Sequence, residues 1–191
     1  MPKQVDHASR RRELVEASWD VIARDGIEGI TLRKVAAAAD CTTGRIAHYF
    51  SGRDELILSA LRAAHTRAGK RMVEIANTDP NAVERLRRVI REALPLDAKR
   101  LQEWKVWIVF WNAAAANRDL AKENERRYNE WEALLTRLIA QISGQRGAAA
   151  HAITLMALID GLGIRASLAP TAKTRRLVQN SIDRWLLDLT R

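Results

Sequence analysis

Apolar residues recur at every third or fourth position along nearly the whole of this 191-residue chain. That spacing places them on one face of an α-helix, whereas a half-buried β-strand would alternate apolar and polar residues. Glycine, proline and asparagine interrupt the pattern at intervals and mark the ends of helices. The sequence therefore predicts an all-α fold of about nine helices.

The composition limits the class of protein. Apolar residues make up 47% of the chain, which excludes disordered and fibrous proteins. The apolar runs are shorter than the roughly 18 residues of a membrane span, and the first residues lack an apolar signal segment. The single cysteine, Cys41, excludes an internal disulfide. These features favour a cytoplasmic protein without a membrane partner.

The net charge of +9 favours a polyanionic partner such as nucleic acid. The excess is not concentrated near the N-terminus, because residues 1–62 hold ten Lys or Arg against nine Asp or Glu, a net of +1. DNA binding by this segment would therefore depend on where its basic residues lie rather than on their number.

Residues 31–56 have the pattern of two short helices separated by a tight turn, followed by the start of a third. Thr31 and Thr42 are suited to cap the first two helices. The second helix, residues 42–50, begins with small and polar residues and ends with aromatic ones. Such a helix can place its N-terminal end in the major groove of DNA while its other end is anchored in protein.

The front of this second helix offers groups for DNA contact. Gly44 permits close backbone approach, although glycine costs about 1 kcal/mol of helix stability relative to alanine. Arg45 can pair with guanine or bind a phosphate, while His48 and Tyr49 can donate to phosphates, Tyr49 having packing within the protein as its alternative role. The predicted DNA-binding residues are Thr31, Arg33, Thr42, Thr43, Gly44, Arg45, His48, Tyr49 and Arg53.

These motifs resemble the DNA-binding part of the TetR family of bacterial repressors. The resemblance is carried by Gly26, by TLRKVA at 31–36, by TTGRIAHYF at 42–50, and by R-x-x-L at 53–56. It implies a homodimer whose two DNA-binding parts bind a palindromic double-stranded operator. It also implies a helical ligand-binding part that takes a small-molecule inducer.

The family pattern is not matched everywhere. Asp40 and Cys41 occupy the turn between the two short helices, where the family usually has glycine and valine. The resemblance and the helix pattern divide the chain into a helix-turn-helix head, residues 1–53, and a helical body for ligand binding and dimerisation, residues 54–191. A long helix after the head is expected to join the two without a flexible linker.

The body carries a stripe of aromatic residues. Trp104, Trp107 and Trp111 are spaced i, i+3 and i+7 and share one helix face, and Tyr128 and Trp131 lie on the next predicted helix. A stripe of this kind is either ordinary core or the wall of a ligand pocket, where aromatic faces attract cations. The predicted ligand-binding residues are Trp104, Trp107, Trp111, Tyr128 and Trp131, with Glu103, Asn112 or Glu132 as polar groups nearby.

Residues 104–111 and 157–168 also resemble the body of the choline-responsive BetI subgroup of the TetR family. The resemblance makes choline or another cationic compound the candidate inducer. Gly163 stands where that subgroup is expected to have a bulkier residue, which would reshape the pocket or the subunit interface.

Two predicted C-terminal helices, residues 148–168 and 174–189, have long apolar faces. Two such helices from each subunit can form a four-helix interface, whereas the alternative is that both complete the core of one subunit. One head covers only half of a two-fold DNA site, so the dimer is favoured. The predicted interface residues are Ile153, Met156, Asp160, Ile164, Ile182 and Trp185.

Other functions receive little support from the sequence. The four histidines are far apart and lack the spacing of metal ligands. A phosphate-binding glycine loop is also missing, so catalytic residues, a metal site and a cofactor are not predicted. The remaining alternatives to a DNA-binding regulator are an enzyme and a helical ligand- or partner-binding module without DNA activity.

Overall fold

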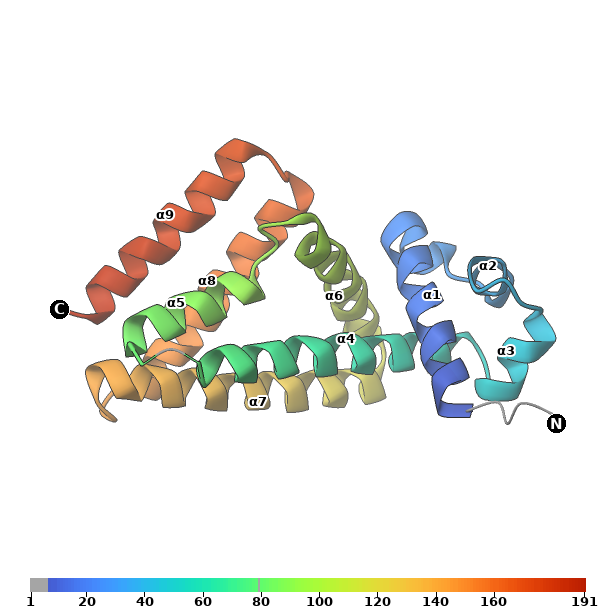
Figure 1. Cartoon of the computed structure of the whole chain (residues 1–191), viewed down its shortest axis with the longest axis horizontal. Coiled ribbons are helices and arrows are strands. Elements are labelled where there is room, and N and C mark those ends of the chain that lie inside the picture. The colour runs from blue at the N-terminus through green and yellow to red at the C-terminus, as the bar shows by residue number, and fades with distance from the viewer. Residues whose placement is uncertain (1–6, 79) are drawn as a thin grey trace.

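The computed structural model describes residues 7–78 and 80–191, which form nine helices and no strand. The all-α prediction of about nine helices is confirmed. In Figure 1, α1 to α3 lie together at one end of the molecule, α4 runs from them into the body, and α7 lies alongside α4. The helices are α1 (His7–Gly29), α2 (Leu32–Ala38), α3 (Thr43–Tyr49), α4 (Arg53–Ala76), α5 (Ala82–Ala93), α6 (Ala98–Ala116), α7 (Arg118–Ser143), α8 (Ala148–Leu168) and α9 (Ala172–Leu189).

The ends of the head helices follow from local sequence. Thr31 Oγ1 accepts a hydrogen bond from the Lys34 amide at 3.2 Å, and Thr42 Oγ1 accepts one from the Arg45 amide at 3.3 Å. These bonds satisfy amide groups that the first turn of a helix leaves unpaired. Near the end of α1, Gly26 has a φ of 68°, a conformation that favours glycine, and it kinks the helix before its last residues.

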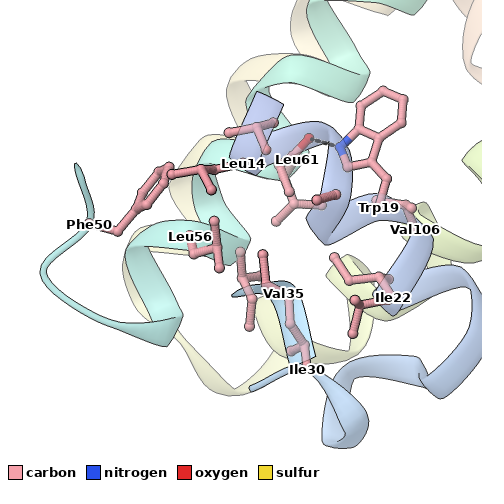
Figure 2. Close-up of a cluster of buried hydrophobic side chains, with 14 of the residues drawn as sticks. Leu14, Trp19, Ile22, Ile30, Val35, Phe50, Leu56, Leu61 and Val106 are labelled. Atoms are coloured by element: carbon pink, nitrogen blue, oxygen red, sulfur yellow. Dashed lines mark hydrogen bonds between the residues drawn. The ribbon is translucent and has the colours of Figure 1, made fainter. Parts of the chain in front are cut away.

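The core of the head extends beyond residue 53. Apolar side chains of α1 to α3 pack against Leu56 and Leu61 of α4 and against Val106 of α6 (Figure 2). The indole of Trp19 donates to the Ala60 carbonyl at 2.9 Å, which ties α1 to α4. The first half of α4 is therefore built into the head core, and α4 belongs to both parts of the molecule.

The body has a second core, built mainly from α5, α7, α8 and α9. By length and composition alone α8 would be able to cross a membrane. Eight of its residues are buried in the protein, however, and its closest packing is against α7. This is the arrangement of a core helix in a folded helical body.

Buried ion pairs fasten the second half of α4 to the body. The Arg71 guanidinium donates to Glu92 of α5 at 2.6 Å and to Glu103 of α6 at 2.7 Å. Arg100 also pairs with Glu92. Three helices thus meet at one charged cluster, which positions α4 relative to α5 and α6.

Candidate functional site

The front of α3 is an exposed surface at the end of the molecule. Thr43, Gly44, Arg45 and His48 are exposed, whereas Ile46 is fully buried beneath them. The buried side of α3 anchors it in the head core, so its polar side faces outward. Among residues 7–78 and 80–191, the Arg45 guanidinium pairs with no side chain.

Among the described residues, nothing packed against position 44 requires glycine there. A Cβ built at this position would meet only the Thr42 hydroxyl, at 3.9 Å, and the backbone φ lies outside the left-handed region. Alanine would fit here and would favour the helix. The space beside Gly44 is therefore open among the described residues.

The other predicted DNA contacts surround α3. Thr31 and Arg33 are exposed at the start of α2. Tyr49 is half-buried, and its ring lies 5.3 Å from that of His48. The Arg53 Nε donates to the Ile30 carbonyl at 2.9 Å, so this side chain also holds the start of α4 against the head.

A cavity of about 490 Å³ lies in the body between α4, α6, α7 and α8. Its walls include Trp104, Trp107 and Trp111 of α6 together with Tyr128 and Trp131 of α7. The five aromatic residues that were predicted from the sequence to bind a ligand therefore line one cavity. Its volume lies within the range of about 300–1,000 Å³ that is typical of sites for drug-sized ligands.

The polar groups of the cavity differ from those expected. Glu103, Asn112 and Glu132 do not line it, and Glu103 instead pairs with Arg71. The polar residues that line the cavity come from α4, α7 and α8, so the residue spacing along a single helix could not identify them. They are His65, Asn124, Arg127, Glu130, Arg137 and Asp160.

Asp160, predicted at the subunit interface, lines the cavity. It accepts a hydrogen bond from the Tyr128 hydroxyl at 2.7 Å. Burial raises the pKa of this carboxyl, and the hydrogen bond from Tyr128 partly opposes that shift. No ion pair to Asp160 is formed within residues 7–78 and 80–191. A cation placed beside this carboxyl would favour its charged form, and the described residues supply none by an ion pair.

His65 of α4 meets α7 at the edge of the cavity. Its Nδ1 lies 2.7 Å from an Arg127 Nη atom, and Arg127 is also bonded to Glu123 at 2.8 Å. Burial, with the adjacent Arg127 charge, lowers the pKa of the His65 imidazole to about 4. The neutral ring can therefore accept a hydrogen bond from Arg127, which links a cavity wall to the helix that carries the head.

The predicted interface residues fall into two groups. Ile153 and Ile164 of α8 are 56% and 40% exposed. Met156 and Ile182 are only 7% and 3% exposed, because they fill the core of the body rather than an outer face. The half-buried Trp185 packs against the same core. Two further apolar residues near the C-terminus, Leu168 and Leu187, are also exposed.

Comparison with known proteins gives two family matches. Residues 14–60 match the profile described as bacterial regulatory proteins, tetR family. Residues 82–191 match the profile described as BetI-type transcriptional repressor, C-terminal. The first covers the head and the start of α4, and the second covers α5 to the end of the chain.

Whole-length relatives agree with these matches. The transcriptional regulator PksA of Bacillus subtilis is 29% identical over 198 residues, covering 100% of this chain and 97% of the relative. The regulator BetI of Paraburkholderia phymatum is 31% identical over 198 residues, covering 96% of each. Both are named as helix-turn-helix regulators.

Solved structures show the same fold. A transcriptional regulator from Rhodococcus sp. superposes with a TM-score of 0.86 at 27% identity, covering 94% of this chain and 95% of the other. A regulator from Saccharomonospora viridis, solved in complex with choline, gives 0.85 at 26% identity, covering 94% and 96%. The head motif, the helical body and these comparisons agree. The chain belongs to the TetR family of bacterial transcriptional regulators, with a C-terminal region of the BetI type.

Proposed function

We propose that this regulator is a dimeric cytoplasmic repressor that leaves its operator when an organic cation enters the body cavity. The observation that carries the proposal is the shared position of α4. Its first half lies in the head core, and its second half, with His65, Ala68 and Met72, forms a wall of the aromatic cavity. A ligand that displaces this wall therefore acts on the helix that carries the head.

The DNA contact is assigned to the exposed side of α3. Arg45 and the small residues before it would approach base edges, while Thr31, His48 and Tyr49 would contact phosphates. Arg33, in the first turn of α2, and Arg53, in the first turn of α4, would contact the DNA backbone. Two observations support this assignment: the open space at Gly44, and an Arg45 guanidinium that pairs with no side chain among the described residues.

The DNA assignment is tested on a duplex selected from randomised sequence. Arg45→Ala and Tyr49→Ala should both weaken binding, and only Arg45→Ala should relax preference at one base pair, by about 1–3 kcal/mol. Arg176→Ala, an exposed arginine on α9, is the charge-matched control. Equal loss over all duplexes would assign Arg45 to a phosphate. Salt-independent or absent binding by the wild type would favour a ligand-binding module without DNA activity.

The dimer is assigned to the exposed apolar residues of α8 and α9. Ile153, Ile164 and Leu168 lie along one side of α8, and Leu187 is 60% exposed on α9. Covering this surface with a second copy would remove apolar area from water. Ile164→Asp should shift sedimentation from dimer to monomer at micromolar concentration. Ala121→Asp, at an exposed position on α7, should not, and a monomeric wild type would refute the assignment.

The ligand is assigned to the class of organic cations. Four tryptophans and Tyr128 supply aromatic faces around the cavity, and Asp160 supplies a carboxylate without an ionic partner among the described residues. The choline complex of the Saccharomonospora viridis neighbour supports the same class. Titration calorimetry with choline and tetraethylammonium tests it. Asp160→Asn should weaken binding about tenfold. If the wild type binds neither compound, the assignment of the ligand to organic cations is wrong.

Release from DNA requires a difference in ligand affinity between two arrangements of the heads. Saturating cation should therefore lower operator affinity, and by linkage the operator should lower cation affinity by the same factor. Anisotropy of labelled duplex, measured with and without ligand, reports this coupling. A cation that binds the body and leaves operator affinity unchanged would refute the release mechanism while leaving the binding site intact.

A further inference from the structure

Trp104 of α6 packs tightly against Gly163 of α8. Both residues are buried, and the six-membered ring of Trp104 lies directly over the glycine backbone. A Cβ built on Gly163 would overlap three ring atoms, of which the farthest, Cζ3, is only 2.5 Å away. Non-bonded carbon atoms do not approach so closely. A side chain at position 163 and the ring in its present place are therefore mutually exclusive.

A hydrogen bond and a ring contact also fix the position of the Trp104 indole. Its Nε1 donates to the Ala93 carbonyl at 2.8 Å, and the ring packs edge-to-face on Trp111 with centroids 5.6 Å apart. Trp104 is 6% exposed, so most of its surroundings are filled by protein. The cavity is the open space beside it. A residue that pushed the ring off α8 would drive it into that space.

The cavity carboxylate lies next to this contact. Asp160 and Gly163 are three residues apart on α8 and therefore share a helix face. A cation that pairs with Asp160 would carry its substituents past the ring of Trp104. The position of this ring thus decides how large those substituents can be.

We propose that the absence of a side chain at Gly163 sets the ligand size, by seating Trp104 against α8 and leaving room for a bulky organic cation. A cation with only methyl substituents would leave much of a 490 Å³ aromatic cavity without contacts. The ligand class is an ammonium compound that carries large apolar groups. This inference rests on the proposed cation-binding function and specifies its ligand.

A series of tetraalkylammonium ions tests the inference, because the charge stays constant while the size grows. The wild type should bind tetrabutylammonium more tightly than tetramethylammonium in titration calorimetry. Gly163→Ala should weaken tetrabutylammonium binding by about tenfold or more and change tetramethylammonium binding by less than about threefold. An unchanged order of affinities in Gly163→Ala would overturn the inference.

Two further variants separate the contact from general effects on α8. Gly161→Ala makes the same substitution two residues away, where a Cβ meets nothing within 4 Å, and it should keep the wild-type order. Because Gly161 is exposed on α8, sedimentation of this variant should also be measured to check that its oligomeric state is unchanged. The double variant Trp104→Phe/Gly163→Ala removes the outer ring atoms that the Cβ would overlap, so tetrabutylammonium binding should recover. Failure to recover would also count against the inference.

Trp104→Phe alone covers the case in which Gly163→Ala does not fold. It enlarges the same space and should strengthen or preserve tetrabutylammonium binding, so a specific loss would overturn the inference. If the wild type binds no ammonium ion, the proposed cation-binding function is wrong, but the inference that Gly163 sets the ligand size is still to be tested. The neutral fluorophore N-phenyl-1-naphthylamine then replaces the series. Weaker fluorophore binding by Gly163→Ala or tighter binding by Trp104→Phe would support the inference, and equal or absent binding would overturn it.

Discussion

Two arginines one helical turn apart on α4 show how differently the head and the body hold this helix. Arg67 reaches back to the head, where its guanidinium lies 4.9 Å from the centre of the Trp19 ring, and its side chain is 46% exposed. Arg71 reaches into the body, where it bridges Glu92 and Glu103 and is 24% exposed. The first contact is open to solvent, whereas the second lies among buried carboxylates.

The two regions also direct their polar residues differently. The head has an apolar interior and turns Thr43, Arg45 and His48 outward, where a second molecule can reach them. The body turns polar groups inward, with Asp160 and His65 at the cavity and Arg71 between helices. Changes in the head should therefore alter DNA affinity more than stability, and changes in the body should do the reverse.

The largest effect is expected for Arg71→Met. It removes the cation that the buried carboxylates of Glu92 and Glu103 share and leaves Glu92 with Arg100 alone, which should cost about 3–5 kcal/mol of unfolding free energy. Arg67→Met, one turn away, should cost less than about 1 kcal/mol because its contacts are exposed. Urea unfolding of both variants gives the comparison. Equal losses would show that α4 is held as firmly by the head as by the body.

Gly44→Ala should separate stability from DNA affinity. A helix favours alanine over glycine by up to about 1 kcal/mol, and the space at this position is open, so the melting temperature should rise. If the helix front approaches DNA closely, the added methyl group should weaken operator binding about tenfold, or about 1.4 kcal/mol. Calorimetric melting and DNA titration measure the two effects. Unchanged DNA affinity would place the base contacts away from Gly44.

The head could be predicted in detail because its determinants are local. The caps at Thr31 and Thr42 each act within three residues of their own position. The aromatic wall of the cavity could be predicted for a similar reason, since the i, i+3, i+7 spacing of the tryptophans puts them on one side of α6.

The body was less predictable because its faces depend on how separate helices pack. Ile153 and Met156 are both apolar and only three residues apart, yet one is exposed and the other buried. The apolar pattern of a helix does not show which of its apolar residues pack in the core of their own chain and which lie on its surface. Asp160 joined Tyr128 only through the packing of α8 on α7, a contact over 32 residues of sequence.

His65 should make the stability of the body depend on pH. Its pKa is lowered to about 4 in the folded protein, against about 6.5 when unfolded, so between these values the unfolded chain binds the extra proton. Stability should fall as the pH drops through this window. The loss at pH 5 should be about 1 kcal/mol, because partial exposure reduces the full linkage value by about half. His65→Gln should remove this component from urea unfolding curves, and an unchanged pH dependence would assign it to other groups.

The smallest effect is expected in the head, at the turn before α3. Asp40 has a φ of 47°, a left-handed conformation that costs most residues with a side chain about 1–2 kcal/mol and costs aspartate less. Asp40→Gly should relieve the strain, but glycine also gains entropy in the unfolded chain, so the net gain should be only about 0.5 kcal/mol. Asp40→Ala, which keeps a Cβ and loses the short polar group, should be less stable than the wild type. Thermal melting should thus rank glycine above aspartate and aspartate above alanine. The same order in DNA affinity would mean that the turn positions α3 for binding, whereas a change confined to melting would mean that the turn limits stability alone.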